Sequence, residues 1–123
     1  MDDLYLDTIL DLYKHPHHAG WLAEDSVYTR KTASAINASC GDHFEVALHI
    51  QDHIIKDAKW RGQGCAISSA AMDQVCSWMI GKDISALQSL SKETILQLLG
   101  LETIIPAREK CAFLSLHLRF IDV

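Results

Sequence analysis

The segment HFEVALHIQDHIIKDAKWR, residues 43–61, decides the fold because its hydrophobicity alternates on either side of a turn. Its first half places four apolar residues at every second position: Phe44, Val46, Leu48 and Ile50. This period of two is typical of a strand with one buried face. The QDH turn at 51–53 leads into a second strand over 54–61. The segment therefore predicts an antiparallel hairpin.

The residues outside the hairpin predict one more strand and several helices. Residues 27–36, rich in β-branched and small residues, form the expected first strand. Helical periodicity predicts helices over about 3–15, 65–80, 84–90 and 91–99, and a last helix that Pro106 opens. The first helix carries Leu6, Ile9, Leu10 and Tyr13 at helical spacing, and the last is expected to point Cys111, Leu114, Leu118 and Ile121 inward. We expect an α+β fold, a three-stranded antiparallel sheet with helices packed on it, as a single domain over residues 1–123.

Composition narrows the function classes. The 123 residues carry a net charge of −5, which argues against general nucleic-acid binding, because such binding needs a basic face to neutralise phosphates. No apolar run approaches the ~18 residues that a membrane span requires. The first ten residues are acidic where a signal peptide is basic. We therefore expect a cytoplasmic protein with reduced thiols, in which a disulfide framework is disfavoured.

The four cysteines differ in their predicted positions. Cys76 lies in the middle of a helix and is interpreted as a small core residue. Cys65 follows the GQG loop and begins a helix, where the helix dipole favours thiolate. Cys111 lies in the first turn or so of the last helix, beside Lys110, and Cys40 lies just ahead of a strand. Metal binding, thiol chemistry and plain burial are all compatible with these positions.

Three of these cysteines and one carboxylate lie at ends of elements that could meet at one edge of the domain. Cys40, Cys65, Cys111 and Asp42 would give three soft sulfur ligands and one oxygen, a set that selects zinc or an iron–sulfur cluster. The long spacings between the cysteines, and the carboxylate, differ from the paired hairpins of structural zinc sites. The pattern favours chemistry or delivery over a purely structural zinc domain.

Three ordered motifs resemble the IscU/SufU/NifU N-terminal group of iron–sulfur cluster assembly proteins. They are SCGD at 39–42, GQGCAISSAAM at 62–72 and PAREKCAFL at 106–114, and DLYKHPHHAG at 11–20 is similar to the family's N-terminal segment. The resemblance covers nearly the whole chain. It implies a three-stranded antiparallel sheet with helices against it, and it implies that Cys40, Asp42, Cys65 and Cys111 bind a [2Fe–2S] cluster or Zn²⁺.

The resemblance also implies partners and roles. Sulfur is expected to arrive as persulfide from a PLP-dependent cysteine desulfurase, and the cluster to pass to apo iron–sulfur proteins. Cys111 is the expected persulfide acceptor, Asp42 the labile ligand, and Lys110 a residue that could guide persulfide or shift the pKa of Cys111. The segment IIPAR at 104–108 only loosely matches the motif that dedicated chaperones bind, which argues against such a partner.

Two roles stay open within this family. A scaffold would collect iron and sulfide and transfer a cluster, whereas a zinc-dependent sulfurtransferase would accept persulfide sulfur and act as an enzyme. Lys110 stands where IscU-type scaffolds have histidine, which favours the sulfurtransferase. The chain is too short between Cys65 and Cys111 for the helical insertion of the SufU branch, which favours the scaffold. We place the scaffold slightly ahead.

Overall fold

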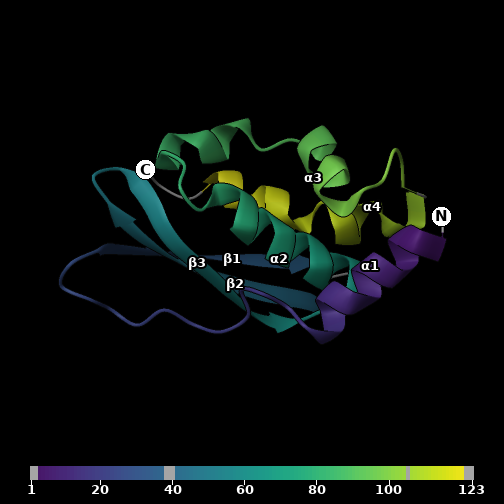
Figure 1. The fold of residues 1–123 in the computed structure, drawn as a ribbon, viewed down its shortest axis with the longest axis horizontal. Helices are drawn as coiled ribbons and strands as arrows, with labels where there is room; N and C mark the ends of the chain where they lie inside the picture. Colours follow the sequence, from purple (N-terminus) through teal and green to yellow (C-terminus); the bar gives the residue numbers. More distant parts are fainter. Residues whose placement is uncertain (1–2, 38–40, 105, 121–123) are drawn as a thin grey trace.

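The computed structural model describes residues 3–37, 41–104 and 106–120 and confirms the α+β class. Its elements in chain order are α1 (Asp3–Lys14), β1 (Thr29–Asn37), β2 (Asp42–Gln51), β3 (Ile54–Gln63), α2 (Ala66–Met79), the 3₁₀ helix η1 (Ile84–Ser89), α3 (Lys92–Leu99), α4 (Pro106–Ala112) and the 3₁₀ helix η2 (Leu114–Phe120). Figure 1 shows this arrangement. No helix in the described part of the chain is long and apolar enough to cross a lipid bilayer.

The three strands form one antiparallel sheet in the order β1-β2-β3. The hairpin predicted over 43–61 is confirmed as β2 and β3. Its two turn residues, Asp52 and His53, have positive φ angles of 54° and 65°. Both residues of a type I′ turn adopt such angles, and the backbone twist of this turn matches the twist of the flanking strands.

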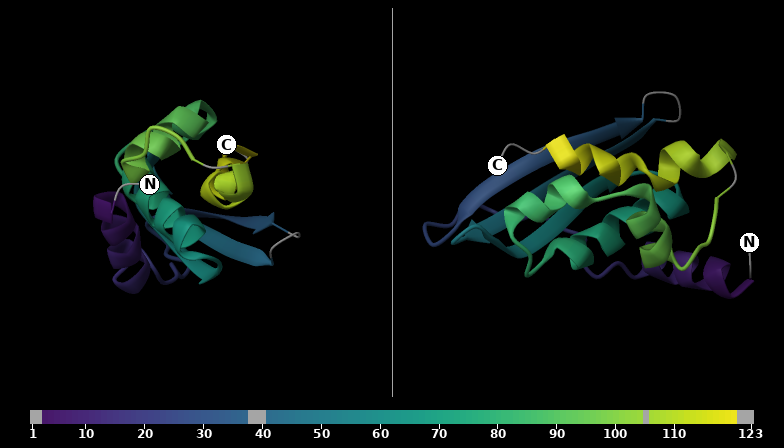
Figure 2. Two further views of the ribbon diagram at one scale, coloured as in Figure 1. Left: turned by 90° about the vertical axis from the view of Figure 1, so that its right-hand side faces the viewer. Right: turned by 90° about the horizontal axis from the view of Figure 1, so that it is seen from above.

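One face of the sheet carries the core and the helices. Phe44, Val46 and Leu48 are each 0% exposed and line this face of β2. Helix α2 contacts β3, and α1 and α3 pack in turn against α2. Helix η2 contacts β1, so the helices gather on one side of the sheet (Figure 2). The fold therefore brings the N-terminal end of α2 and the end of α4 to the end of the sheet where β2 begins.

Two helices differ in detail from the sequence-based prediction. Helix α1 buries Ile9 and Leu12, whereas Tyr13 is 49% exposed. Ile9 and Leu12 are three residues apart and lie on the side of α1 that faces α2, whereas Tyr13 lies outside this buried face.

The predicted last helix is also wrong in one respect, because it breaks after Ala112. The N–H of Leu116 donates to the carbonyl of Phe113 in a 3₁₀ turn. No proline or glycine lies at the break, and the helix η2 that follows packs against β1. Cys111 lies in the last turn of this short α4.

Candidate metal centre

Asp42 is the first residue of β2 and lies on the core face of the sheet. Gly41 precedes it with a φ of 77°, a left-handed angle that glycine adopts without strain. Because side chains alternate along a strand, Asp42 shares its face with Phe44. The carboxylate is therefore only 5% exposed, although it lies at the end of the strand.

Cys65 caps the N-terminus of α2. Its backbone is extended, and its sulfur accepts a hydrogen bond from the backbone N–H of Ser68 at 3.5 Å. The helix thus begins where Gly62 and Gly64 end the strand pattern, as the sequence predicts. An N-cap sulfur faces the unpaired N–H groups of the first turn, which stabilise negative charge.

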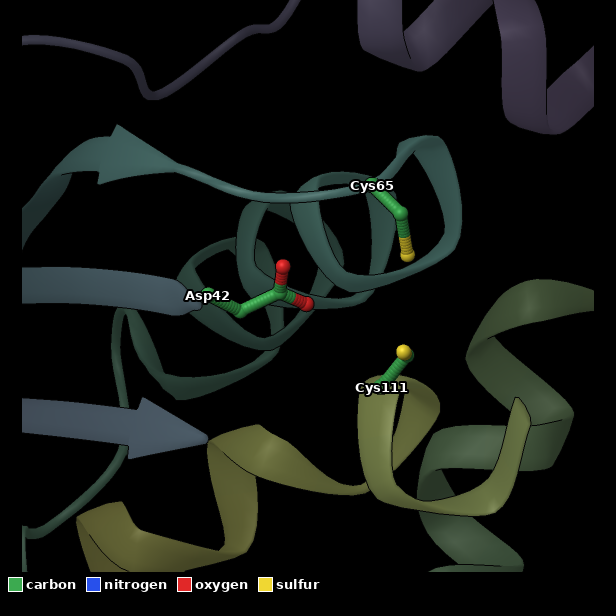
Figure 3. A group of neighbouring side chains, drawn as sticks. All are labelled: Asp42, Cys65 and Cys111. Atoms are coloured by element: carbon green, nitrogen blue, oxygen red, sulfur yellow. The ribbon is translucent and has the colours of Figure 1, made fainter. Parts of the chain in front are cut away.

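The structure brings Asp42, Cys65 and Cys111 together. One ligand atom from each lies within 4.8 Å of the other two. Figure 3 shows these side chains converging from β2, α2 and α4. Cys111 is 7% exposed and Cys65 is partly buried, so this cluster of three side chains is largely shielded from water.

The donor set suits zinc or an iron–sulfur cluster. A tetrahedral ion with ~2.3 Å bonds to sulfur holds its ligand atoms roughly 3.8 Å apart, so only a small inward movement is needed. Two sulfur donors and one oxygen favour soft or borderline metals over magnesium and calcium. Cys40, the remaining predicted ligand, lies outside the described residues.

Hydrogen bonds favour the thiolate form of Cys65. Burial acts to raise the pKa of its thiol, but polar contacts with the Ser68 side chain, the backbone N–H groups of Ser68 and Ile67, and Cys111 together lower the pKa below its ordinary value. A thiolate is the form that binds metals.

The other residues singled out in the sequence lie apart from this cluster. Cys76 is 0% exposed in the core, and burial raises the pKa of its thiol. This confirms its interpretation as a core residue. Lys110 is exposed and lines a cavity of about 310 Å³ together with Ile36, Asn37, Phe113, Leu114 and His117. Lys110 precedes Cys111 in the sequence, but it is exposed to solvent whereas Cys111 is buried.

Sequence reasoning missed two polar residues of α2. Ser68 is 1% exposed, and its hydroxyl donates to Asp42 Oδ2 at 2.9 Å. Asp73 is 0% exposed and accepts hydrogen bonds from the N–H groups of His17 and His18 and from the indole of Trp60. The one available signal was a serine and an aspartate among the apolar residues of a helix.

A cavity of about 460 Å³ adjoins Asp42. Its lining comes from α1, the start of β2, the end of β3 and α2: Tyr13, Gly41, Asp42, Trp60, Gly62, Gln63, Gly64 and Ser69. The carboxylate of Asp42 therefore borders a cavity, which the sequence did not predict.

Comparison with known proteins identifies the family of this chain. The NifU-like N-terminal domain model matches residues 4–118. The chain belongs to this family. The matched residues include Asp42, Cys65 and Cys111, the three side chains that converge in the structure.

Individual relatives of this NifU-like chain include both branches of the family. It is 32% identical to the zinc-dependent sulfurtransferase SufU of Bacillus subtilis, over 94% of this chain and 86% of the relative. It is 32% identical to the iron–sulfur cluster assembly scaffold protein IscU of Thermotoga maritima, over 73% of this chain and 61% of the relative. A crystal structure of a putative SUF-system scaffold from Fervidobacterium islandicum matches with a TM-score of 0.72, 27% identity and 92% coverage of both chains.

Proposed function

We propose that this chain accepts sulfur from a PLP-dependent cysteine desulfurase and assembles a [2Fe–2S] cluster on Cys40, Asp42, Cys65 and Cys111 for transfer to apo iron–sulfur proteins. The observation that carries the proposal is the convergence of Asp42, Cys65 and Cys111 within 4.8 Å from three separate elements. Membership of the NifU-like family supports it. The proposed working unit is the whole chain, residues 1–123.

Cys111 is the proposed sulfur acceptor. Its thiolate attacks the outer sulfur of the donor persulfide, so one S–S bond forms, the donor's S–S bond breaks and the donor leaves as a thiolate. Lys110, exposed beside Cys111, is proposed to attract the anionic persulfide as it approaches. The partial burial of the site protects the new persulfide from competing thiols.

A second candidate function is a zinc-dependent sulfurtransferase. The similarity to SufU of Bacillus subtilis along 94% of this chain favours it, as does Lys110. When bound, Zn²⁺ would hold thiolates deprotonated at neutral pH. The two roles differ in what they consume. A scaffold reduces persulfide sulfur to sulfide, and ferrous iron supplies only part of the electrons, so an external reductant is needed. Persulfide transfer needs none.

Metal analysis of untagged protein purified without oxygen distinguishes these roles. Iron with acid-labile sulfide and visible absorption, formed with a desulfurase, cysteine, ferrous iron and a reductant, supports the scaffold. About one zinc per chain, with no such absorption after the same treatment, supports the sulfurtransferase. The Cys111→Ser variant is expected to lose the cluster or the sulfur transfer, whereas Cys76→Ala, the control in the core, retains it. A folded protein that binds neither metal would refute both roles.

A further inference from the structure

Ser68 links two predicted ligands that are far apart in sequence. Its hydroxyl oxygen lies 2.9 Å from Oδ2 of Asp42 and 3.4 Å from the sulfur of Cys65. The backbone N–H of the same residue donates to that sulfur at 3.5 Å. One buried residue in the first turn of α2 therefore contacts both the carboxylate and a thiol of the cluster.

The hydroxyl has one proton and three possible acceptors. These are Asp42 Oδ2, the sulfur of Cys65 and the carbonyl of Cys65 at 3.1 Å. The carboxylate oxygen is the nearest of the three, at 2.9 Å against 3.1 Å for the carbonyl and 3.4 Å for the sulfur. Ser68 therefore donates to Asp42, and this bond fixes one of the two carboxylate oxygens.

The surrounding backbone leaves space for this hydroxyl. A Cβ at Gly64 would come within 2.6 Å of the Ser68 oxygen and within 2.5 Å of the ring of Phe44. Glycine at this position thus allows the hydroxyl to reach Asp42. The N-cap bond to Cys65 fixes the turn of α2 from which Ser68 extends.

We propose that Ser68 is a positioning residue that holds Asp42 through Oδ2 and leaves Oδ1 as its single metal-binding oxygen. This inference rests on the proposed function, because it assigns Asp42 to the metal. Hydrogen-bonded partners of ligands orient them, and loss of such a partner commonly costs 10–100-fold in metal affinity. The same hydrogen bond would keep the Asp42 carboxylate within the site when it is not bound to a metal.

Zinc affinity of the whole chain is the first measurement, made by competition with a chromophoric chelator. Ser68→Ala is expected to weaken zinc binding by about 10–100-fold, whereas Ser68→Thr, which keeps the hydroxyl, restores most of it. Ser69→Ala is the matched control. Ser69 is 4% exposed in the same turn of α2, and within the described residues its hydroxyl forms no hydrogen bond with Asp42 or Cys65. Thermal unfolding checks that each variant is folded.

A double-mutant cycle tests whether Ser68 acts through Asp42. If it does, Ser68→Ala changes zinc affinity by less than about 3-fold in an Asp42→Ala background. Cobalt(II) in place of zinc gives a second readout. The ligand-field bands of Ser68→Ala are expected to shift because the carboxylate is reoriented, and the thiolate charge-transfer band is expected to persist because the sulfurs remain.

The outcomes separate this inference from the proposed function. A parent chain that binds neither zinc nor cobalt refutes the metal centre itself. A parent that binds, with Ser68→Ala binding equally well, refutes only the role of Ser68. Additive losses from Ser68→Ala and Asp42→Ala also refute it. Equal losses in Ser68→Ala and Ser68→Thr refute it as well, because they indicate packing and not the hydroxyl.

Discussion

Replacing Asp73 tests how α2, the helix that carries Cys65 and Ser68, is held in the fold. Asp73 is 0% exposed, and its two oxygens accept three hydrogen bonds. Oδ1 accepts from the N–H of His18 at 2.8 Å and from the indole of Trp60 at 2.9 Å, and Oδ2 accepts from the N–H of His17 at 3.1 Å. This carboxylate therefore joins the segment after α1 and strand β3 to the middle of α2.

The hydrogen-bond pattern sets the expected cost. A hydrogen bond to a charged group contributes about 1.5–3 kcal/mol, and a buried donor left without a partner costs about 1–3 kcal/mol. The indole donor is buried, whereas the two backbone donors are only partly buried and water reaches them more easily. Removing the carboxylate also removes its desolvation cost. We expect Asp73→Ala to lower the free energy of unfolding by about 4 kcal/mol and Asp73→Asn, which keeps Oδ1, by about 1–2 kcal/mol.

Urea unfolding followed by Trp fluorescence and circular dichroism measures these losses. With a slope of about 2 kcal/mol per molar urea, the midpoint falls by about 2 M for Asp73→Ala and by about 0.5–1 M for Asp73→Asn. All samples need the same zinc content, because a ligand that binds only the folded state adds stability. Asp11→Ala, an exposed aspartate of α1, is the control and is expected within about 0.5 kcal/mol of the parent. A loss below about 1 kcal/mol for Asp73→Ala would refute this reasoning.

Three other predictions each test a single feature. Gly62→Ala is expected to cost at least about 3 kcal/mol in urea unfolding, because a Cβ there overlaps the carbonyl of His43 at a φ of 137°. Gly81→Ala has a φ of 90° but open space around the Cβ, so a loss as large in this control would exclude the overlap as the cause. Cys76 is expected to resist iodoacetamide between pH 7 and 9 in the folded protein, because burial raises the pKa of its thiol. Mass spectrometry checks this, and alkylation as fast as in urea would contradict it. Asp42→Ala is expected to slow release of the cluster or of sulfur to an acceptor, because the exchangeable ligand is gone. An unchanged transfer rate would count against Asp42 as the labile ligand.

Periodicity was sufficient to predict most of the fold. The alternation of apolar residues over 44–50 predicts β2, and the change to helical spacing after Gly64 predicts α2 with Cys65 at its start. Both signals are local, because burial of one face of a strand or helix imposes a fixed period on the sequence. The break after Ala112 has no proline or glycine to signal it, and the helix η2 that follows packs on β1, which is distant in the sequence. The exposure of Tyr13 likewise depends on how α1 sits against α2.

The candidate site was likewise predictable from the sequence only in part. Thiols and a carboxylate at the ends of elements suggested a meeting point, and the structure places Asp42, Cys65 and Cys111 at one. Ser68 and Asp73 were not predictable by this reasoning, because Asp42 lies 26 residues from Ser68 and the partners of Asp73 lie 13 to 56 residues from it. A buried polar residue in an apolar helix face signals that a partner exists, but tertiary structure alone determines which partner it is.

Helix α2 connects metal binding to the stability of the whole chain. Its first turn holds Cys65 and Ser68 at the cluster, and its middle holds Asp73 at the segment after α1. An ion bound by residues of β2, α2 and α4 would join three elements, so its binding free energy would add to the free energy of folding. Asp73→Ala and Ser68→Ala should then separate the two functions of the helix. Loss of Asp73 lowers stability with or without metal, whereas loss of Ser68 lowers mainly the part of the stability that added zinc provides.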